Sequence, residues 1–586
     1  MGSIRFFQNF ICALAGLTIA YWACVLVGAN QNSGLIATLM AAIVFWLISS
    51  RIQKNQEIRY SKDFFVLLGV SIFFASITAF LYAFNPDDST FFHRIAFLRL
   101  SGDIFLPNYD TRIAFDQVAP ISAAHLMTSW EYFLSNFGSF FGSEIIGYQI
   151  GGTFVSIMLY AFSVNYAVAH FFPKTSASTR VIVAGSVFLF LFFGDADQNR
   201  RIGAWLFLGG WTGKCFLSAA LITLFPAFDR AYETNRPDDW FFVFCTVVFF
   251  LGLTGSSLFI LPLAIAALIL TELIVRKGAS PRFMSFLLAA VPVTVGGIFI
   301  YKFGGLKDDS YWRGFETMPF SDYIKLSLSS RSLFIYLALI PILLYKNLEI
   351  NRAALIKFSV YQLVLGIVLL NPLLLPVFHK FVPSDGFWRI YYLFQYPTIV
   401  AMLGMIVINF IKIQSYNIAL LPSLFLVLII AAGSNIFSLQ KQWGYPHHFK
   451  GLFEEKLPEI ELMSVRKASE NCRHFKESAT LLAPEQWEVT AQMLEPSLRS
   501  VAARHMHHNF LNTNTAQIKV PEDVRLRARN FATGLQDGSA EDFRFLIAKG
   551  VDIIVIRSQV ENGASLMLNN YKKVLTEGDY VVFCRN

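Results

Sequence analysis

The sequence predicts a mainly α-helical protein: a polytopic transmembrane bundle followed by a small C-terminal α/β domain outside the cytoplasm. Three observations predict this fold class. Of the 586 residues, 55% are hydrophobic, 60 of them Phe, and only 15% are charged, against roughly 25% in an ordinary soluble domain. Apolar runs long enough to cross the ~30 Å hydrocarbon core of a bilayer recur through residues 1–440. Residues 441–586 are charged, are interrupted by prolines and contain no long apolar run.

The apolar runs predict thirteen membrane spans. The first run is long and no clear small-x-small cleavage site follows it, so we interpret it as a retained span and not as a signal peptide. The fifth and seventh runs are short, and the loss of either span would invert the orientation of everything downstream. The predicted spans are 8–28, 34–50, 63–84, 145–170, 181–194, 204–228, 239–252, 256–275, 283–302, 329–345, 354–378, 388–411 and 416–438.

Basic residues predict the orientation of these spans. Short cytoplasmic loops carry an excess of Lys and Arg, and five loops on one side each hold at least two. We therefore expect the protein in the cytoplasmic (inner) membrane, with a cytoplasmic N-terminus and the C-terminal domain in the periplasm or outside the cell. The same loops explain the net charge of +8, so no nucleic-acid partner is expected. The five basic loops are 51–62, 171–180, 229–238, 276–282 and 346–353.

An acidic pair lies where the third predicted span ends, in the run Asn85-Pro86-Asp87-Asp88. It opens an external region, 85–144, in which we expect juxtamembrane helices. Two adjacent carboxylates near a low-dielectric surface raise the pKa of one of them, which suits proton abstraction. The pair could instead bind Mg²⁺ or Mn²⁺ through hard oxygen ligands. A helix N-cap, which stabilises a helix by roughly 1 kcal/mol, is the structural alternative.

Basic residues also occur at the predicted external ends of spans. A lysine inside a membrane span is costly and is by default a functional candidate, although it could snorkel or pair with an acid. A guanidinium binds phosphate oxygens through a bidentate fork, so these residues suit a lipid phosphate. The candidates are Arg200 and Arg201 before the sixth span, Lys214 within that span, and Arg389 at the start of the twelfth.

Further polar and aromatic residues of the external segments are auxiliary candidates on the acceptor side. His93 follows the acidic pair on a predicted amphipathic helix, and His125 and Glu131 belong to a second helix over 120–137. Asp309 belongs to a second acidic pair, which an ordinary solvated loop would also explain. Trp388 precedes Arg389, and an aromatic belt at the membrane interface is its alternative role.

The C-terminal region is expected to fold as a small α/β domain. Its two cysteines, Cys472 and Cys584, could form a disulfide if the domain is exported, but sequence alone does not show the required proximity. The expected elements are buried strands at 479–484 and 551–556, a helix at 540–549, and a hairpin at 573–583 that turns at 577–579.

Taken together, these features resemble the GT-C superfamily, whose polytopic glycosyltransferases use lipid-linked sugar donors. The resemblance is to bacterial members that use polyprenyl-phosphate sugars. Many of those proteins carry the acid after the first span, whereas here it follows the third. The matching features are Asn85-Pro86-Asp87-Asp88, the stretch 200–214, Phe387-Trp388-Arg389 and the terminal α/β domain.

The resemblance implies transfer of a hexosyl or pentosyl group from a polyprenyl-phosphate donor to an extracytoplasmic glycan, lipid or protein acceptor, with inversion. Asp87 or Asp88 would be the general base, and the four basic residues would hold the donor phosphate. Two other classes compete. A transporter or flippase of lipid-linked glycans predicts ionisable residues along a path and an internal repeat. A polymerase or ligase of lipid-linked glycans would use external Arg and His and would not need the acidic pair. A non-catalytic assembly scaffold is a weaker third alternative, because it gives no reason for the costly intramembrane Lys214.

Overall fold

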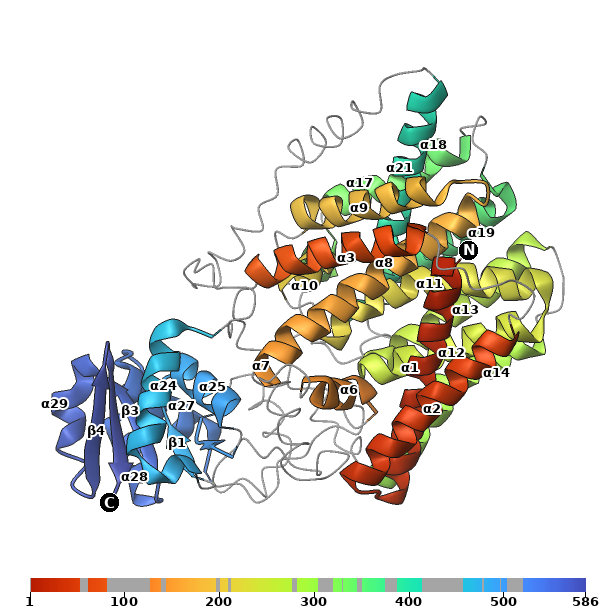
Figure 1. Ribbon diagram of the computed structural model, residues 1–586. Coiled ribbons are helices and arrows are strands. Elements are labelled where there is room, and N and C mark those ends of the chain that lie inside the picture. Colours follow the sequence, from red (N-terminus) through yellow and green to blue (C-terminus); the bar gives the residue numbers. More distant parts are fainter. Residues whose placement is uncertain are drawn as a thin grey trace.

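Two parts of different architecture make up the structure, a helical bundle and a smaller domain built on one sheet (Figure 1). The computed structural model describes residues 2–52, 62–81, 127–138, 144–195, 201–208, 212–276, 282–303, 320–328, 330–344, 350–374, 387–413, 457–476, 479–495, 497–502 and 520–586.

The bundle helices follow the apolar runs of the sequence. Within the described residues, six are long and apolar enough to cross a membrane. The outward faces of bundle helices are apolar as well: Ile36 of α2 is 65% exposed and Phe65 of the shorter helix α3 is 61% exposed, as expected where lipid is the solvent. The helices are α1 (Gly2–Val27), α2 (Gln31–Ile52), α3 (Lys62–Leu81), α6 (Ser129–Gly138), α7 (Glu144–Ile146), the π-helix η2 (Gly147–Gly151), α8 (Gly152–Phe171), α9 (Ala177–Gly194), α10 (Ile202–Leu208), α11 (Gly213–Thr234), α12 (Pro237–Leu253), α13 (Ser257–Val275), α14 (Phe283–Phe303), α16 (Phe320–Ser327), α17 (Ser330–Leu337), α18 (Leu339–Leu344), α19 (Arg352–Leu369), the 3-10 helix η3 (Phe387–Leu393) and α21 (Tyr396–Ile413).

Most predicted spans correspond to single helices, including the two shortest, which are α9 and α12. Three predicted spans are wrong in detail. Span 204–228 is divided between α10 and α11, span 329–345 between α17 and α18, and span 388–411 begins as η3 before α21. The thirteenth predicted span, 416–438, lies outside the described residues.

The break between η3 and α21 is stabilised by two buried glutamines. Gln362 Nε2 donates to the carbonyl oxygen of Leu393 at 3.3 Å. Gln395 Nε2 donates to the carbonyl oxygen of Leu221 at 2.8 Å. Non-helical backbone is tolerated at membrane depth only where protein groups satisfy its hydrogen bonds. Gln362 satisfies two backbone groups of the turn, because its Oε1 atom also accepts from the backbone N–H of Gln395 at 3.3 Å, and the side chain of Gln395 joins the turn to α11.

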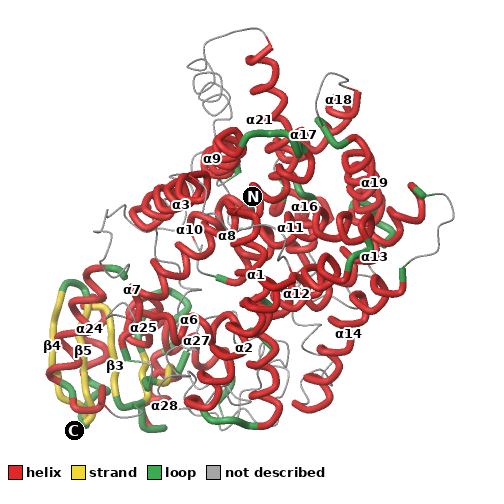
Figure 2. Tube along the Cα trace, turned by 45° about the vertical axis from the view of Figure 1, so that its right-hand side comes forward, coloured by secondary structure: helices red, strands yellow, loops and turns green. Residues whose placement is uncertain are grey.

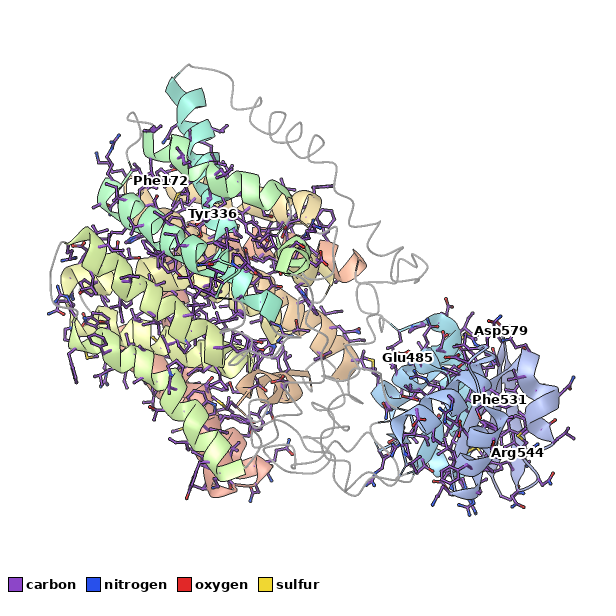
Figure 3. The ribbon with its side chains drawn as sticks, turned by 180° about the vertical axis from the view of Figure 1, so that it is seen from behind. Phe172, Tyr336, Glu485, Phe531, Arg544 and Asp579 are labelled. Atoms are coloured by element: carbon purple, nitrogen blue, oxygen red, sulfur yellow. A yellow bond between two sulfur atoms is a disulfide. The ribbon has the colours of Figure 1, made fainter. Side chains whose placement is uncertain are left out.

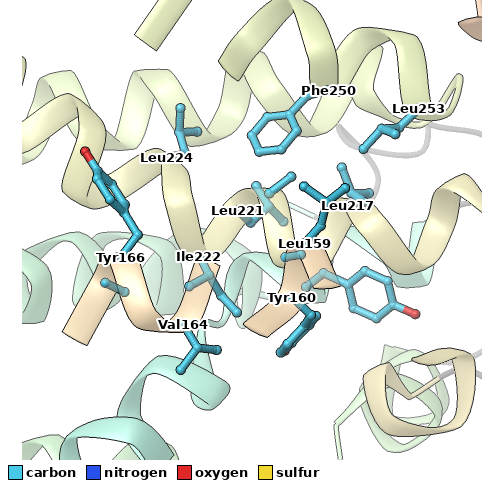
Figure 4. Packing of buried hydrophobic residues seen from close by; sticks show 14 of the residues in the cluster. Leu159, Tyr160, Val164, Tyr166, Leu217, Leu221, Ile222, Leu224, Phe250 and Leu253 are labelled. Atoms are coloured by element: carbon cyan, nitrogen blue, oxygen red, sulfur yellow. The ribbon is translucent and has the colours of Figure 1, made fainter. Parts of the chain in front are cut away.

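Apolar side chains of neighbouring helices interlock in the bundle interior. Figure 4 shows one such region, where Leu159 of α8, Leu217 and Leu221 of α11, and Phe250 of α12 come together, all fully or almost fully buried. Aromatic pairs add to this packing. For example, the ring centroids of Phe74 in α3 and Phe188 in α9 are 4.8 Å apart.

The C-terminal domain has a five-stranded sheet in the order β2-β1-β3-β5-β4, with helices around it (Figure 2). Strands β1, β2 and β3 are parallel, and β5 is antiparallel to β3 and β4. Its elements are α24 (Glu459–Asn471), η4 (Arg473–Lys476), β1 (Thr480–Leu482), α25 (Glu485–Leu494), β2 (Arg499–Ser500), α27 (Glu522–Thr533), α28 (Ala540–Ala548), β3 (Ile553–Arg557), η6 (Ser558–Val560), α29 (Glu561–Ser565), β4 (Tyr571–Glu577) and β5 (Tyr580–Arg585).

The predicted elements of this domain are confirmed. The two expected strands are β1 and β3, the expected helix is α28, and the hairpin β4–β5 turns at Gly578, whose φ of +56° favours glycine. The helices enclose apolar side chains; the rings of Phe531 and Phe543, for instance, are 5.0 Å apart (Figure 3). A disulfide joins Cys472 to Cys584, with the two Cα atoms 6.1 Å apart.

The domain packs against the bundle through its first helices. Leu462 of α24 and Val489 and Met493 of α25 belong to the same hydrophobic cluster as the bundle interior. Figures 1 and 2 both show α25 on the side of the domain that faces α7. The domain therefore lies at the end of the bundle that carries α6 and α7.

Candidate functional site

Several helix junctions meet at one end of the bundle, which we call the junction end. It contains α6, the end of α9 with α10, the start of α11, the α12–α13 corner, and η3 with the start of α21. The sequence prediction places 85–144 and 195–203 outside the cytoplasm, and it has the sixth span (204–228) and the twelfth span (388–411) begin on that same side. Hydrogen bonds between residues far apart in sequence hold this end together. For example, Trp22 Nε1, near the end of α1, donates to the carbonyl oxygen of Met127, just before α6, at 2.8 Å.

Two glycines allow close approach at the end of α12. A Cβ atom at Gly213 would lie 1.9 Å from the carbonyl oxygen of Leu253, and one at Gly252 would lie 2.4 Å from Ser129 Oγ. The first turn of α11 and the start of α6 therefore both contact the end of α12. The next residue after Gly213 is Lys214, so these contacts place its backbone at the junction end.

The structure corrects the prediction that Lys214 lies inside a continuous sixth span. The preceding residues form the separate helix α10, and α11 begins only at Gly213. Lys214 is thus in the first turn of α11. The apolar residues on both sides merge into one run in a hydropathy profile, so the prediction missed the division, although Gly209, Gly210 and Gly213 are a turn signal in the sequence.

Arg389 lies at the α12–α13 corner. Its half-buried guanidinium donates through Nη1 to Ser256 Oγ, immediately before α13. The neighbouring residues of η3, Ile390 and Tyr391, are fully buried and hold this segment in the bundle. Trp388 is on the same short helix. Arg389 and the backbone of Lys214 therefore both lie beside the end of α12.

A buried carboxylate that the sequence analysis did not single out also lies at the junction end. Asp195 follows α9 and is 0% exposed. Its Oδ2 atom accepts from the backbone N–H of Gly203 at 3.0 Å and from the hydroxyl of Tyr396. Its Oδ1 atom accepts from Ser332 Oγ at 3.1 Å. The signal that could have indicated it is an acid directly after an apolar run and close in sequence to two arginines.

Arg201 lies next to this carboxylate. It is 6% exposed, immediately precedes α10, and interacts electrostatically with Asp195. Gly203 packs tightly against the end of α9, because a Cβ atom there would lie 2.1 Å from the carbonyl oxygen of Leu191. The start of α10 is therefore held closely against α9.

Of the auxiliary candidates, the structure describes Glu131 and the backbone of Trp388. Glu131 is in the first turn of α6 and is 5% exposed. Among the residues that the structure describes, no group of three or more His, Cys, Asp or Glu side chains could hold a metal ion. The candidates outside the described residues are Asp87, Asp88, His93, His125, Arg200 and Asp309.

The opposite end of the bundle holds a separate group of buried charges. Lys357 of α19 contacts Asp229 of α11 at 2.7 Å and Glu272 of α13 at 3.3 Å. His170 Nε2, at the end of α8, lies 2.8 Å from the other oxygen of Asp229. These side chains bind one another and join four helices.

No protein-family model matches the sequence, and no curated protein sequence is significantly similar to it. Solved structures are similar over most of the chain. ArnT from Cupriavidus metallidurans in the apo state has a TM-score of 0.52 at 9% identity, covering 89% of this chain and 97% of that protein. The same protein bound to undecaprenyl phosphate has a TM-score of 0.50 at 11% identity, with the same coverage.

A third similar structure is the archaeal oligosaccharyltransferase AglB from Archaeoglobus fulgidus, in complex with an inhibitory peptide and a dolichol-phosphate. Its TM-score is 0.50 at 11% identity, covering 87% of this chain and 71% of that protein. At such identities the similarity establishes the fold. The predicted architecture, a helical membrane bundle with a small C-terminal α/β domain, is confirmed.

Proposed function

We propose that this protein is an integral membrane glycosyltransferase that moves a sugar from a polyprenyl-phosphate donor to an acceptor outside the cytoplasm. One observation carries the proposal. Arg201, Lys214 and Arg389, which the sequence predicts to bind a donor phosphate, come from separate elements that meet at the junction end. The fold is shared with a protein whose structure contains undecaprenyl phosphate.

The chemistry of the donor explains why cations should gather there. A sugar on a polyprenyl phosphate leaves behind a phosphate anion, and fixed positive groups stabilise the charge that develops on it. Arginine is especially suited because its planar fork binds two phosphate oxygens at once. Arg201 and Arg389 are both wholly or partly removed from solvent, where such interactions are stronger than in water. Arg200 completes the proposed set.

We assign the general base to Asp87 or Asp88, which would take the proton of the acceptor hydroxyl in a single inverting displacement. The alternative role of the same two carboxylates is to bind an Mg²⁺ or Mn²⁺ ion. The transferred group is a hexose or a pentose, and the acceptor is a glycan, a lipid or a protein. The auxiliary acceptor-side candidates are His93, His125, Glu131, Asp309 and Trp388.

The disulfide supports the proposed orientation. Disulfides persist in oxidising compartments and are rare in the cytosol, and the bond between Cys472 and Cys584 lies in the C-terminal domain. The domain packs at the junction end. We therefore place the junction end and the domain on the external face of the cytoplasmic membrane, with the N-terminus in the cytoplasm.

A transporter of lipid-linked glycans is the second candidate, because ionisable side chains do lie inside the bundle. Lys357, Asp229 and Glu272 are each about 5% exposed or less. These charges contact one another in one cluster at the end of the bundle opposite the proposed site. A structural role explains them with fewer assumptions than a transport path.

The test is sugar transfer in membranes that contain the protein, from a panel of radiolabelled polyprenyl-phosphate sugars to the endogenous acceptors of those membranes. The wild type is expected to transfer from at least one donor, and the double variant Asp87→Asn/Asp88→Asn is expected to be inactive. Asp238→Asn, which changes an acid at the opposite end of the bundle, is the matched control and should remain active. Each reaction is repeated with EDTA to test for a divalent cation.

Two outcomes contradict the proposal at different levels. No transfer from any donor by a folded wild-type protein would overturn the glycosyltransferase assignment and favour the transporter. Transfer that survives in the double variant would remove only the base assignment.

A further inference from the structure

The buried carboxylate of Asp195 connects four separate elements. The residue itself ends α9, and its oxygens accept hydrogen bonds from Gly203 in α10, Ser332 in α17 and Tyr396 at the start of α21. Two of these partners are distant in the chain, 137 and 201 residues away.

The burial of this carboxylate needs an explanation, because burying an ionised group away from water is costly unless it is paired and hydrogen-bonded. The chain contains a useful comparison. Asp229, also buried, is bound directly by the ammonium of Lys357 at 2.7 Å. Asp195 accepts instead from one backbone N–H and two hydroxyls, with the charge of Arg201 acting on it from nearby. Its contacts are directed at the two segments that carry the proposed phosphate-binding arginines.

Both connections follow from the chain. Arg201 is two residues before Gly203, whose backbone packs so closely against α9 that a Cβ atom there would lie 2.1 Å from the carbonyl oxygen of Leu191. Arg389 is on η3, which leads within a few residues to Tyr396. A movement at either hydrogen bond would therefore displace one arginine relative to the other.

We propose that Asp195 is a positioning residue that sets the relative placement of Arg201 and Arg389, and so determines how tightly the protein binds the phosphate of its lipid donor. This inference rests on the proposed function, because it assumes that the two arginines bind that phosphate. Asp195 does not contact the donor in this scheme. It acts through the hydrogen bonds that hold α10 and the start of α21.

The experiment measures the binding of undecaprenyl phosphate and of undecaprenol, which lacks the phosphate, to purified full-length protein in detergent. The ratio of the two affinities isolates recognition of the phosphate from general binding of the lipid. Asp195→Asn is expected to reduce this ratio by about tenfold or more, as is typical when a residue that orients a ligand-binding group is lost. Tyr396→Phe, which keeps the carboxylate and removes one donor, is expected to reduce it less.

Asp229→Asn is the matched control, since it makes the same chemical change at a buried aspartate of the opposite end. It should lower the unfolding temperature but leave the phosphate preference at the wild-type value. If Asp195→Asn does not fold, the result of Tyr396→Phe decides.

The outcomes separate the two proposals. A wild type that binds both lipids equally would contradict the proposed donor and hence the proposed function. A wild type that prefers the phosphate, with the same preference in Asp195→Asn and Tyr396→Phe, would overturn the positioning role and leave the proposed function intact.

Discussion

Lys357 offers the most direct test of the forces that hold the bundle together. Its side chain is 5% exposed, and its ammonium contacts Asp229 at 2.7 Å, Glu272 at 3.3 Å and Glu233. The three acids come from α11 and α13, while the lysine comes from α19. The contact therefore joins three helices at the end of the bundle opposite to the proposed site.

Replacing Lys357 by Met keeps a side chain of similar length but removes the charge. Asp229 and Glu272 are each 4% exposed, so both would remain buried without their shared cation. Removing one partner of a buried ion pair typically costs about 3–5 kcal/mol. Because Arg276 still contacts Glu272 at 2.8 Å and His170 still contacts Asp229, we expect the lower value, about 3 kcal/mol.

The assay is equilibrium unfolding of the detergent-purified protein, followed by circular dichroism. Lys325→Met is the matched control, because that lysine is 74% exposed and lies 3.5 Å from Asp322; its loss should cost less than about 1 kcal/mol. In the Lys357→Met background, Asp229→Asn should cost much less than it does in the wild type, because the two residues interact directly.

Equal stability of Lys357→Met and the wild type would refute this reasoning. It would mean that the carboxylates are neutral or hydrated in the native protein, so that the lysine compensates no buried charge. Additive effects of Lys357→Met and Asp229→Asn would refute the direct pairing even if each variant were less stable.

Three further predictions concern other parts of the molecule. Gly213→Ala should lower stability by about 1–3 kcal/mol, because the added Cβ atom has no space at the end of α12. Gly69→Ala is the control, since its Cβ atom would meet nothing within 4 Å. Thermal unfolding compares the two variants. Replacing Cys472 and Cys584 by Ala should destabilise the C-terminal domain by about 2–4 kcal/mol. The unfolding of the variant is compared with that of the wild type with and without reductant, and reductant should destabilise only the wild type. Burial raises the pKa of Tyr571 to about 12; its stabilising contribution is complete below its ordinary pKa of about 10 and is lost as the pH rises toward 12. Tyr571→Phe should therefore lose stability less steeply than the wild type over that interval, and identical slopes would contradict the shift.

Much of the fold was predictable because it depends on local patterns. Short apolar runs indicated the buried strands β1 and β3, and the run around Gly578 indicated the hairpin β4–β5 at one edge of the sheet. Apolar runs located α9 and α12 even though both are short. The division between α10 and α11 was missed because the apolar residues on both sides form one hydropathy run, although Gly209, Gly210 and Gly213 indicate a break there.

The candidate site was predictable only in part. Arg201, Lys214 and Arg389 were recognisable because a cation at the predicted external end of a span, or inside one, is unusual. Asp195 was not, because a single aspartate at the end of an apolar run also occurs in ordinary loops. Its burial and its partners depend on Ser332 and other residues far along the chain.

By itself, the sequence predicted a helical membrane bundle followed by a small α/β domain, and the described residues confirm both. Hydropathy, charge and turn residues act within a local segment, so they can be read without knowing what that segment contacts. Only the tertiary structure decided that Asp195 holds α10 against α21, that Lys357 is surrounded by acids, and that Cys472 meets Cys584. Hydrogen bonds, ion pairs and disulfides act over a few ångströms, and which groups come that close is determined by the packing of helices and strands from distant parts of the chain.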